Sequence, residues 1–110
     1  MNEGDKMSDT SVYIIANITI EDASKYRQYE KGFFPILKKF GGELLTYDDA
    51  TTHLEGVNPR PGRVVILKFP SAAKANAWYA EPEYQQLSDN RRAGTTLEFL
   101  TLVHAITPRD

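Results

Sequence analysis

The sequence predicts one α+β domain whose strands and helices follow the order β-α-β-β-α-β. Four segments are rich in β-branched residues, two segments repeat apolar residues at helical spacing, and glycine or proline marks several of the joins. The chain has 110 residues, of which 41% are hydrophobic. This length and composition are typical of a single domain with a modest core.

The first predicted strand, residues 12–20 (VYIIANITI), has one fully apolar face. That face carries Val12, Ile14, Ala16, Ile18 and Ile20, and the other face carries Tyr13, Ile15, Asn17 and Thr19. Asp22 is a suitable N-cap for a helix that extends to about Phe40. We expect Pro35 to kink or restart this helix, because proline removes a backbone donor. Gly41–Gly42 should end it.

The second strand is predicted over residues 43–49 (ELLTYDD), and the turn-forming NPRPG at 58–62 precedes the third strand, residues 63–69. Ser71 can cap a second helix over residues 72–80. Because the residue before a proline avoids helical torsions, Glu81–Pro82 should break that helix and begin another. Residues 95–106 (TTLEFLTLVHAI) predict the last strand.

This order is that of the ferredoxin-like fold, a four-stranded antiparallel sheet with both helices on one face. The predicted strands are nevertheless apolar on both faces. In the third strand Val64 and Ile66 face away from Val65, Leu67 and Phe69, and in the last strand Leu100 and Leu102 are expected to face away from Leu97, Phe99 and Val103. Two helices cover only one face, so a monomer would expose a large apolar patch. We therefore predict a homodimer in which two sheets pack face to face.

Composition limits the partners and the compartment. A formal net charge of −2 gives little attraction for phosphate backbones or anionic lipids, so neither nucleic acid nor a membrane is a predicted partner. Cysteine is absent, which excludes disulfides and thiolate chemistry and is typical of a reducing cytoplasm. Residues 1–10 are polar and unlike a signal peptide. We interpret them as a flexible leader before a domain spanning 11–110, in a cytoplasmic protein.

Several short motifs resemble the domain-of-unknown-function 1330 family. They are LEG at 54–56, RVVILKFPS at 63–71, AWY at 77–79 and PEYQQL at 82–87 followed by Arg91, with Tyr26, Tyr29, Pro35 and the GG pair at 41–42 upstream. The resemblance covers roughly residues 12–103 and implies a dimeric α+β barrel of two ferredoxin-like subunits. Relatives in that superfamily include cofactor-free monooxygenases, isomerases, decarboxylase-like enzymes, haem enzymes and stress-associated proteins. The family itself has no assigned reaction, so the resemblance implies a fold and leaves the function open.

Arg91 is the first candidate site residue, because it shares a helical stripe with Tyr84 and Leu87. Its guanidinium either pairs with a carboxylate as a structural clasp or holds a substrate carboxylate or enolate oxygen in a pocket. Glu55 is the expected partner, as a salt-bridge anchor for its loop or as a base that removes a proton next to a carbonyl. Arg91 and Glu55 are therefore our candidate catalytic residues.

The candidate ligand-binding residues are Asn17, Tyr13, Arg63, Trp78 and Tyr84. Asn17 lies mid-strand on the predicted dimer face, where a buried amide needs partners from a ligand or from a polar network. Tyr13 shares that face. Arg63 forms the mouth of a pocket or lies exposed at a strand end. Trp78 and Tyr84 are core packing or the walls of a site for a planar apolar ligand.

No metal or cofactor is predicted. Asp48, Asp49, His53 and Glu55 match no familiar metal-ligand spacing, and neither His53 nor His104 lies in a haem-binding context. Neither a catalytic triad nor a phosphate loop is recognisable. Three functions remain open: a dimer with a small-molecule pocket, a cofactor-independent enzyme that performs proton transfer or monooxygenation on a small carbonyl or aromatic compound, and a non-catalytic stress-associated or structural dimer.

Overall fold

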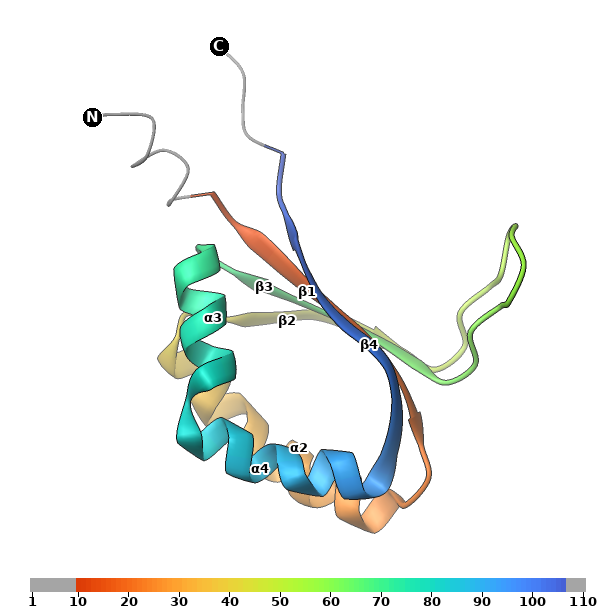
Figure 1. Cartoon of the computed structure of the whole chain (residues 1–110), viewed down its shortest axis with the longest axis horizontal. Helices are drawn as coiled ribbons and strands as arrows, with labels where there is room; N and C mark the ends of the chain where they lie inside the picture. Colours follow the sequence, from red (N-terminus) through yellow and green to blue (C-terminus); the bar gives the residue numbers. More distant parts are fainter. Residues whose placement is uncertain (1–9, 107–110) are drawn as a thin grey trace.

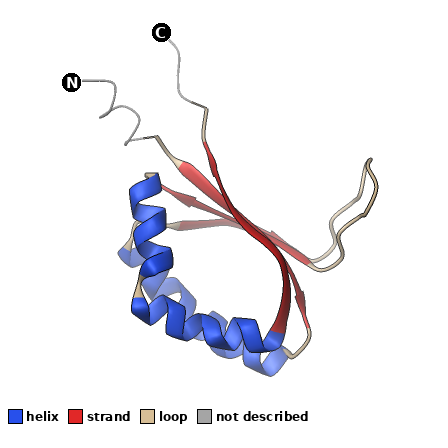
Figure 2. Cartoon of the chain, viewed as in Figure 1, coloured by secondary structure: helices blue, strands red, loops and turns tan. Residues whose placement is uncertain are grey.

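The computed structural model describes residues 10–106, and the predicted leader lies outside them except for Thr10. The elements, in chain order, are β1 (Val12–Ile20), α2 (Ala23–Lys39), β2 (Glu43–Asp48), β3 (Arg63–Phe69), α3 (Ala72–Ala80), α4 (Pro82–Gly94) and β4 (Thr95–His104) (Figure 1). The strands form one antiparallel sheet in the order β2-β3-β1-β4. All three helices lie on the same side of this sheet (Figure 2). The predicted α+β ferredoxin-like arrangement is confirmed.

The helix-covered face, called the inner face below, carries the core. From the strands, the core includes Val12, Ile14, Ile18, Leu67 and Phe69; from the helices it includes Tyr26, Tyr29, Phe33, Ile36, Leu37, Trp78 and Tyr84. Each helix contributes the stripe that three- and four-residue spacing predicts. The inner-face residues of β1 are likewise those of its predicted apolar face.

The helix boundaries follow local sequence signals, with one exception. The Asp22 carboxylate accepts hydrogen bonds from the backbone amides of Ser24 and Lys25, and Ser71 caps α3 in the same manner. The predicted break at Glu81–Pro82 separates α3 from α4, with Pro82 in the first turn of α4. Pro35 does not restart α2, which is assigned as one helix from Ala23 to Lys39. The apolar stripe of α2 packs on the core both before and after Pro35, and this packing outweighs the missing hydrogen bond.

A β-bulge in β4 corrects the predicted orientation of one side chain. Asn17 pairs with Phe99 and the next residue of β1, Ile18, pairs with Leu97, so Glu98 is the extra residue. An inserted residue shifts the alternation of side chains by one position. Leu97 therefore shares the inner face with Leu100, whereas strict alternation predicts that it faces away.

Residues 49–62 form an arm that connects β2 to β3 and projects away from the rest of the fold (Figure 1). Its apolar side chains Leu54 and Val57 are 91% and 87% exposed. The base of the arm is held by Asn17, whose amide donates to the carbonyl oxygens of Pro61 (3.1 Å) and Arg63 (3.2 Å). In residues 10–106 no helix has the length and apolar character needed to cross a membrane.

Candidate functional site

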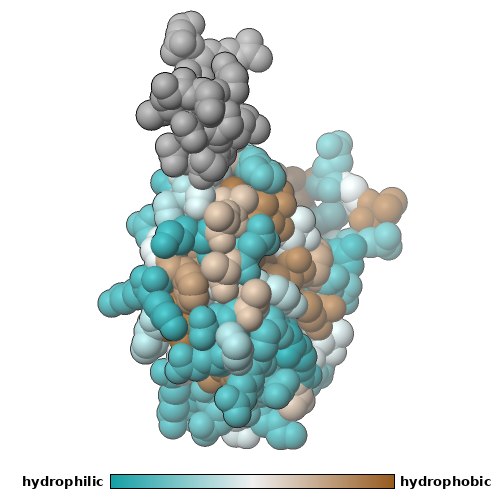
Figure 3. Space-filling model, turned by 60° about the vertical axis from the view of Figure 1, so that its left-hand side comes forward, coloured by the Kyte–Doolittle hydropathy of each residue, from teal (hydrophilic) through white to brown (hydrophobic). Residues whose placement is uncertain are grey.

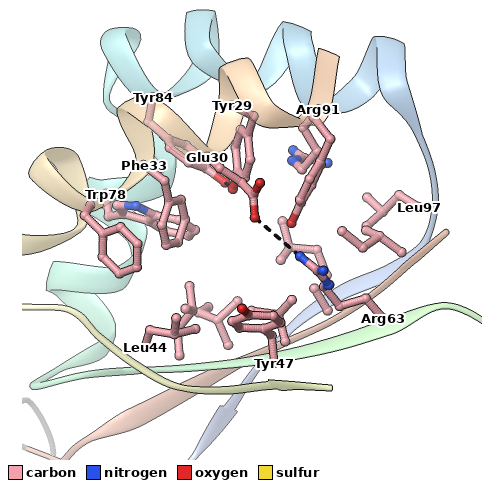
Figure 4. A pocket seen from close by; sticks show the side chains of 18 residues that line it. Tyr29, Glu30, Phe33, Leu44, Tyr47, Arg63, Trp78, Tyr84, Arg91 and Leu97 are labelled. Atoms are coloured by element: carbon pink, nitrogen blue, oxygen red, sulfur yellow. Dashed lines mark hydrogen bonds and ion pairs between the residues drawn. The ribbon is translucent and has the colours of Figure 1, made fainter. Parts of the chain in front are cut away.

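A cavity of about 240 Å³ lies between the inner face of the sheet and helices α2 and α4 (Figure 4). Strand residues supply one wall: Ile14, Ala16, Ile18, Leu44, Tyr47, Arg63, Val65, Leu67, Leu97 and Leu100. Helix residues supply the other: Tyr26, Tyr29, Glu30, Phe33, Phe34, Trp78, Tyr84 and Arg91. The wall is thus mainly aliphatic and aromatic, with three charged side chains.

Arg91 brings a buried positive charge to this wall from the last turn of α4. Its side chain is on the inward stripe with Tyr84, and the residue is only 5% exposed. The guanidinium carbon lies 5.7 Å from the centre of the Tyr29 ring. Among the described residues nothing accepts a hydrogen bond from the buried Nε and Nη1. A buried guanidinium normally pairs with an anion, so this arrangement leaves an anion-binding group unoccupied by protein.

The interior also contains hydrogen-bonding aromatic groups. The hydroxyls of Tyr29 and Tyr84 are 2.7 Å apart, and burial raises the pKa of the Tyr29 hydroxyl well above its ordinary value. Trp78 packs its ring 4.3 Å from that of Tyr84, centre to centre. Its Nε1 donor is buried and has no acceptor among the described residues. Trp78 and Arg91 therefore present donors whose acceptors are not supplied by residues 10–106.

The mouth of the cavity contains a second arginine, Arg63, whose guanidinium is paired with carboxylates. Arg63 Nε and Nη2 donate to the two carboxylate oxygens of Asp49 at 2.7 and 2.9 Å, and Nη1 lies 3.4 Å from Glu30 Oε2. Its guanidinium also covers the Tyr47 ring at 4.5 Å. These partners raise the pKa of Arg63, with the Asp49 hydrogen bonds as the main cause, and they lower the pKa of Asp49. Arg63 is a paired cation at the entrance.

The structure brings together four of the seven predicted site residues. Arg63, Trp78, Tyr84 and Arg91 all line the cavity. Glu55 is exposed on the arm and does not line it, and no ion pair joins Glu55 to Arg91. The expected clasp is therefore absent, because the turns of the arm carry Glu55 away from α4.

Asn17 and Tyr13 lie on the other face of the sheet, called the outer face below. Their neighbours in the sheet register there are Val64 and Phe99 for Asn17, and Lys68 and Val103 for Tyr13. Asn17 is fully buried and uses its amide nitrogen to hold the base of the arm. The nitrogen of Asn17 thus belongs to a polar network with the arm, whereas its Oδ1 is buried and has no partner among the described residues.

Sequence reasoning missed Glu30, which lines the cavity from α2. It stands four residues after Tyr26 and three before Phe33, so it borders the inward stripe, and its side chain is half-exposed. The signal that singled out Arg91 on α4, a charged residue at the spacing of an apolar stripe, was therefore also present on α2. Within residues 10–106 no group of three or more His, Asp or Glu side chains is placed to hold a metal ion. The chemistry available on the wall is anion binding, hydrogen bonding by aromatic side chains, and proton transfer by a carboxylate.

Comparison with known proteins places the chain in a family. Residues 11–105 match the family described as "Domain of unknown function (DUF1330)", and the chain belongs to it. No curated protein matches. A protein of unknown function from Rhodopseudomonas palustris has a similar structure, with a TM-score of 0.69, 15% identity, and coverage of 93% of this chain and 85% of that one.

Two further solved structures share the fold. SnoaB, a cofactor-independent oxygenase from Streptomyces nogalater, has a TM-score of 0.62 and 15% identity, and the match covers 90% of this chain and 96% of SnoaB. A putative antibiotic biosynthesis monooxygenase from Caulobacter crescentus has a TM-score of 0.57 and 11% identity, with coverage of 93% and 95%. At these identities the similarity establishes the fold alone.

Proposed function

We propose that this member of the family binds a small, mainly apolar molecule that carries an anionic oxygen, such as a carboxylate or an enolate, inside the cavity. One observation carries the proposal: Arg91 is 5% exposed and its Nε and Nη1 have no partner among the described residues. An unpaired buried charge is costly, and a bound anion would relieve that cost through charge-assisted hydrogen bonds.

The apolar part of the cavity wall indicates the chemistry of the rest of the ligand. Aliphatic strand residues and the rings of Phe33, Trp78 and Tyr84 surround the cavity, and such surfaces favour a flat hydrocarbon or aromatic body. The volume of about 240 Å³ is below the usual range for drug-sized ligands, about 300–1,000 Å³. A single or fused aromatic ring with one acidic group fits this description.

Calorimetric titration with benzoate, 2-naphthoate and phenylpyruvate tests the proposal, with phenylacetone as the neutral comparison. We expect Arg91→Met to weaken binding of the carboxylates by about 10- to 100-fold, which corresponds to the loss of a hydrogen bond to a charged group. Arg92→Met is the matched control, because Arg92 is exposed and pairs with Gln85 and Asp89. Equal affinity of Arg91→Met and the unaltered protein for the carboxylates, or no binding of any of them, would refute the proposal.

Cofactor-independent catalysis is a second candidate for the same cavity. It is supported by the shared fold with SnoaB, which is described as a cofactor-independent oxygenase, and by Arg91, which lies where it would stabilise an enolate or phenolate. The substrate would be a small carbonyl or electron-rich aromatic compound that reacts with dioxygen. Oxygen uptake by the purified protein with a dihydroxynaphthalene, in the presence of a metal chelator, measures this activity. Uptake that is unchanged in Arg91→Met would contradict it.

We further propose that two copies pair through the outer face of the sheet. Six apolar side chains are aligned there: Tyr13, Ile15, Val64, Ile66, Phe99 and Val103. In one copy no helix of residues 10–106 covers them, because all three helices lie on the other side of the sheet (Figure 2). The helical side that comes forward in Figure 3 is largely hydrophilic in its lower half. A second copy of the same face is a self-complementary cover with two-fold symmetry.

Light scattering coupled to size exclusion tests this pairing. We expect the unaltered protein to elute as a dimer and Ile66→Lys to elute as a monomer, because the new charge would be buried between the sheets. Val57→Lys on the arm is the control, since Val57 is already 87% exposed. A monomer at micromolar concentration for the unaltered chain would exclude this dimer.

A further inference from the structure

We infer that Glu30 is the carboxylate that removes and returns a proton on a ligand held by Arg91, which would make the cavity a site for keto–enol chemistry. The inference rests on the proposed anion binding and adds a residue, a reaction and a substrate class to it. The substrate class is a 2-oxo acid or related ketone with an apolar or aromatic substituent and an acidic C–H bond next to its carbonyl.

Glu30 is the one carboxylate that lines the cavity within residues 10–106. It lies on α2 directly after Tyr29, whose ring is next to Arg91. In Figure 4 its carboxylate points from the helix into the space above the sheet, towards Arg63. The cavity wall therefore carries both a buried cation, Arg91, and a half-exposed carboxylate, Glu30.

Arg63 contacts this carboxylate more loosely than it contacts Asp49. The Arg63 guanidinium makes its two short hydrogen bonds to Asp49, at 2.7 and 2.9 Å, and its contact with Glu30 is 3.4 Å. One Glu30 oxygen is thereby directed, and the other has no hydrogen-bond partner among the described residues. The Glu30 side chain is 50% exposed, which gives the carboxyl group a path for proton exchange with water.

The neighbouring tyrosines are suited to donate hydrogen bonds and unsuited to act as bases. Burial raises the pKa of both Tyr26 and Tyr29, so their hydroxyls stay protonated at neutral pH. Tyr29 also shares a 2.7 Å hydrogen bond with Tyr84. Among the groups on the wall, Glu30 is the acceptor available for a proton from carbon.

The proposed step is balanced without any further reactant. The C–H bond next to the carbonyl breaks, its proton moves to a Glu30 oxygen, and its electron pair forms the C=C bond of an enolate. The negative charge develops on the former carbonyl oxygen, where the Arg91 guanidinium stabilises it. Return of the proton to the same carbon regenerates the ketone, and in D₂O the returned atom is deuterium.

Deuterium exchange into phenylpyruvate, followed by proton NMR in D₂O, tests this inference. We expect the protein to accelerate loss of the methylene signal over buffer, and Glu30→Gln to slow the protein-dependent rate by about 10²- to 10⁴-fold, the usual contribution of a general base. Binding of phenylpyruvate, measured by calorimetry on the same samples, should change little. Glu30→Asp should restore part of the rate, because it retains a carboxylate. Glu43→Gln is the matched control, since Glu43 is exposed on β2 and does not line the cavity.

The outcomes separate this inference from the proposed function. If phenylpyruvate binds in an Arg91-dependent manner but exchange is not accelerated, or if Glu30→Gln exchanges at the unaltered rate, the role of Glu30 is refuted and anion binding stands. If Glu55→Gln abolishes exchange and Glu30→Gln does not, the base is Glu55 on the arm. If no carboxylate binds, anion binding fails first, and protein-dependent exchange fails with it.

Discussion

The mouth and the interior of the cavity each contain an arginine, and the two differ in their partners. At the mouth, Arg63 makes hydrogen bonds to Asp49 and Glu30 and is covered by an aromatic ring. In the interior, Arg91 is more deeply buried. Its guanidinium lies beside the ring of Tyr29, and its Nε and Nη1 have no hydrogen-bond partner among the described residues.

This difference indicates a structural role for one arginine and a ligand-binding role for the other. Arg63 completes its hydrogen bonds within the chain and ties the start of β3 to α2 and to the arm. Arg91 has hydrogen-bond donors without acceptors among the described residues, and it lines the cavity. Perturbed or unsatisfied groups that line a cavity are the ones that mark a site. Substitutions at the mouth and in the interior should separate the two roles, and the largest effect on stability is expected beside Arg63.

The geometry of the mouth depends on Gly62, immediately before Arg63. Its φ is +90°, and an added Cβ would lie 2.3 Å from the carbonyl oxygen of Ile18. We expect Gly62→Ala to lower the free energy of unfolding by about 3 kcal/mol, since it combines backbone strain with overpacking. Gly56→Ala is the control, because Gly56 has φ +110° but its nearest neighbour, His53, is 3.8 Å away; a loss of about 1 kcal/mol is expected there. Urea denaturation measures both, and equal losses would mean that the close contact is unimportant.

The two arginines should respond to the same substitution with opposite signs. In the absence of ligand, Arg91→Met should raise the free energy of unfolding by about 1–3 kcal/mol, because it removes unsatisfied buried donors. Arg63→Met should lower it by about 1 kcal/mol, because its ion pairs have exposed partners and are individually weak. Urea denaturation of the two variants checks the signs. A strong destabilisation by Arg91→Met would instead make Arg91 a structural residue.

The interior should also determine the response to alkaline pH. The folded Tyr29 hydroxyl keeps its proton because burial raises its pKa well above 10.0, whereas an unfolded tyrosine ionises near pH 10. The contribution of Tyr29 to stability should therefore be constant below about pH 10 and fall above it, where only the unfolded chain releases this proton. Tyr29→Phe should cost about 1 kcal/mol at neutral pH through the lost bond to Tyr84 and should flatten the alkaline decrease. Thermal unfolding across the alkaline range measures this, with Tyr79→Phe at an exposed tyrosine as control; an unchanged slope in Tyr29→Phe would contradict it.

The smallest effect is expected at Asp49, at the mouth. The hydrogen bonds from Arg63 hold the pKa of the Asp49 carboxyl below its ordinary value. The pair therefore stabilises the fold at pH values above about 4, where the unfolded aspartate is ionised, and this contribution is lost as the pH falls through the folded pKa. Because the Asp49 side chain is 59% exposed, we expect less than about 1 kcal/mol. Asp49→Asn should remove this acid dependence, and an identical acid transition in both proteins would show that the pair contributes nothing.

The fold was largely predictable because its signals are local. Asp22, Ser71 and Pro82 mark helix starts by their own chemistry, and alternation in β1 identifies its inner face. The orientation of Leu97 was not predictable, because the bulge at Glu98 depends on how β4 pairs with β1. Pro35 was misleading for a related reason: the packing of α2 on both sides of the proline is a property of the whole fold.

The candidate site was predictable only in part. Tyr84 and Arg91 lie seven residues apart on α4, so helical spacing could place them on one face. Trp78 lies on α3, and only its closeness in sequence suggested that it joins them. The position of Glu55 depends on the direction in which the arm projects, and the turn residues of the arm do not specify that direction. Glu30 was overlooked because a charged residue on a helix is usually solvated, and its place beside the cavity is clear only when the tyrosine stripe is known to face that cavity.

The junction between α4 and β4 contains no loop, since α4 ends at Gly94 and β4 begins at Thr95. The Gly94 carbonyl accepts hydrogen bonds from the amides of Glu21 and Asp22, and a Cβ at Gly94 would lie 2.9 Å from the Asp22 carbonyl oxygen. One inserted residue between Arg91 and this junction would rotate the arginine by about 100° around the helix. The number of residues from Arg91 to Thr95 is therefore constrained for as long as the cavity keeps its cation.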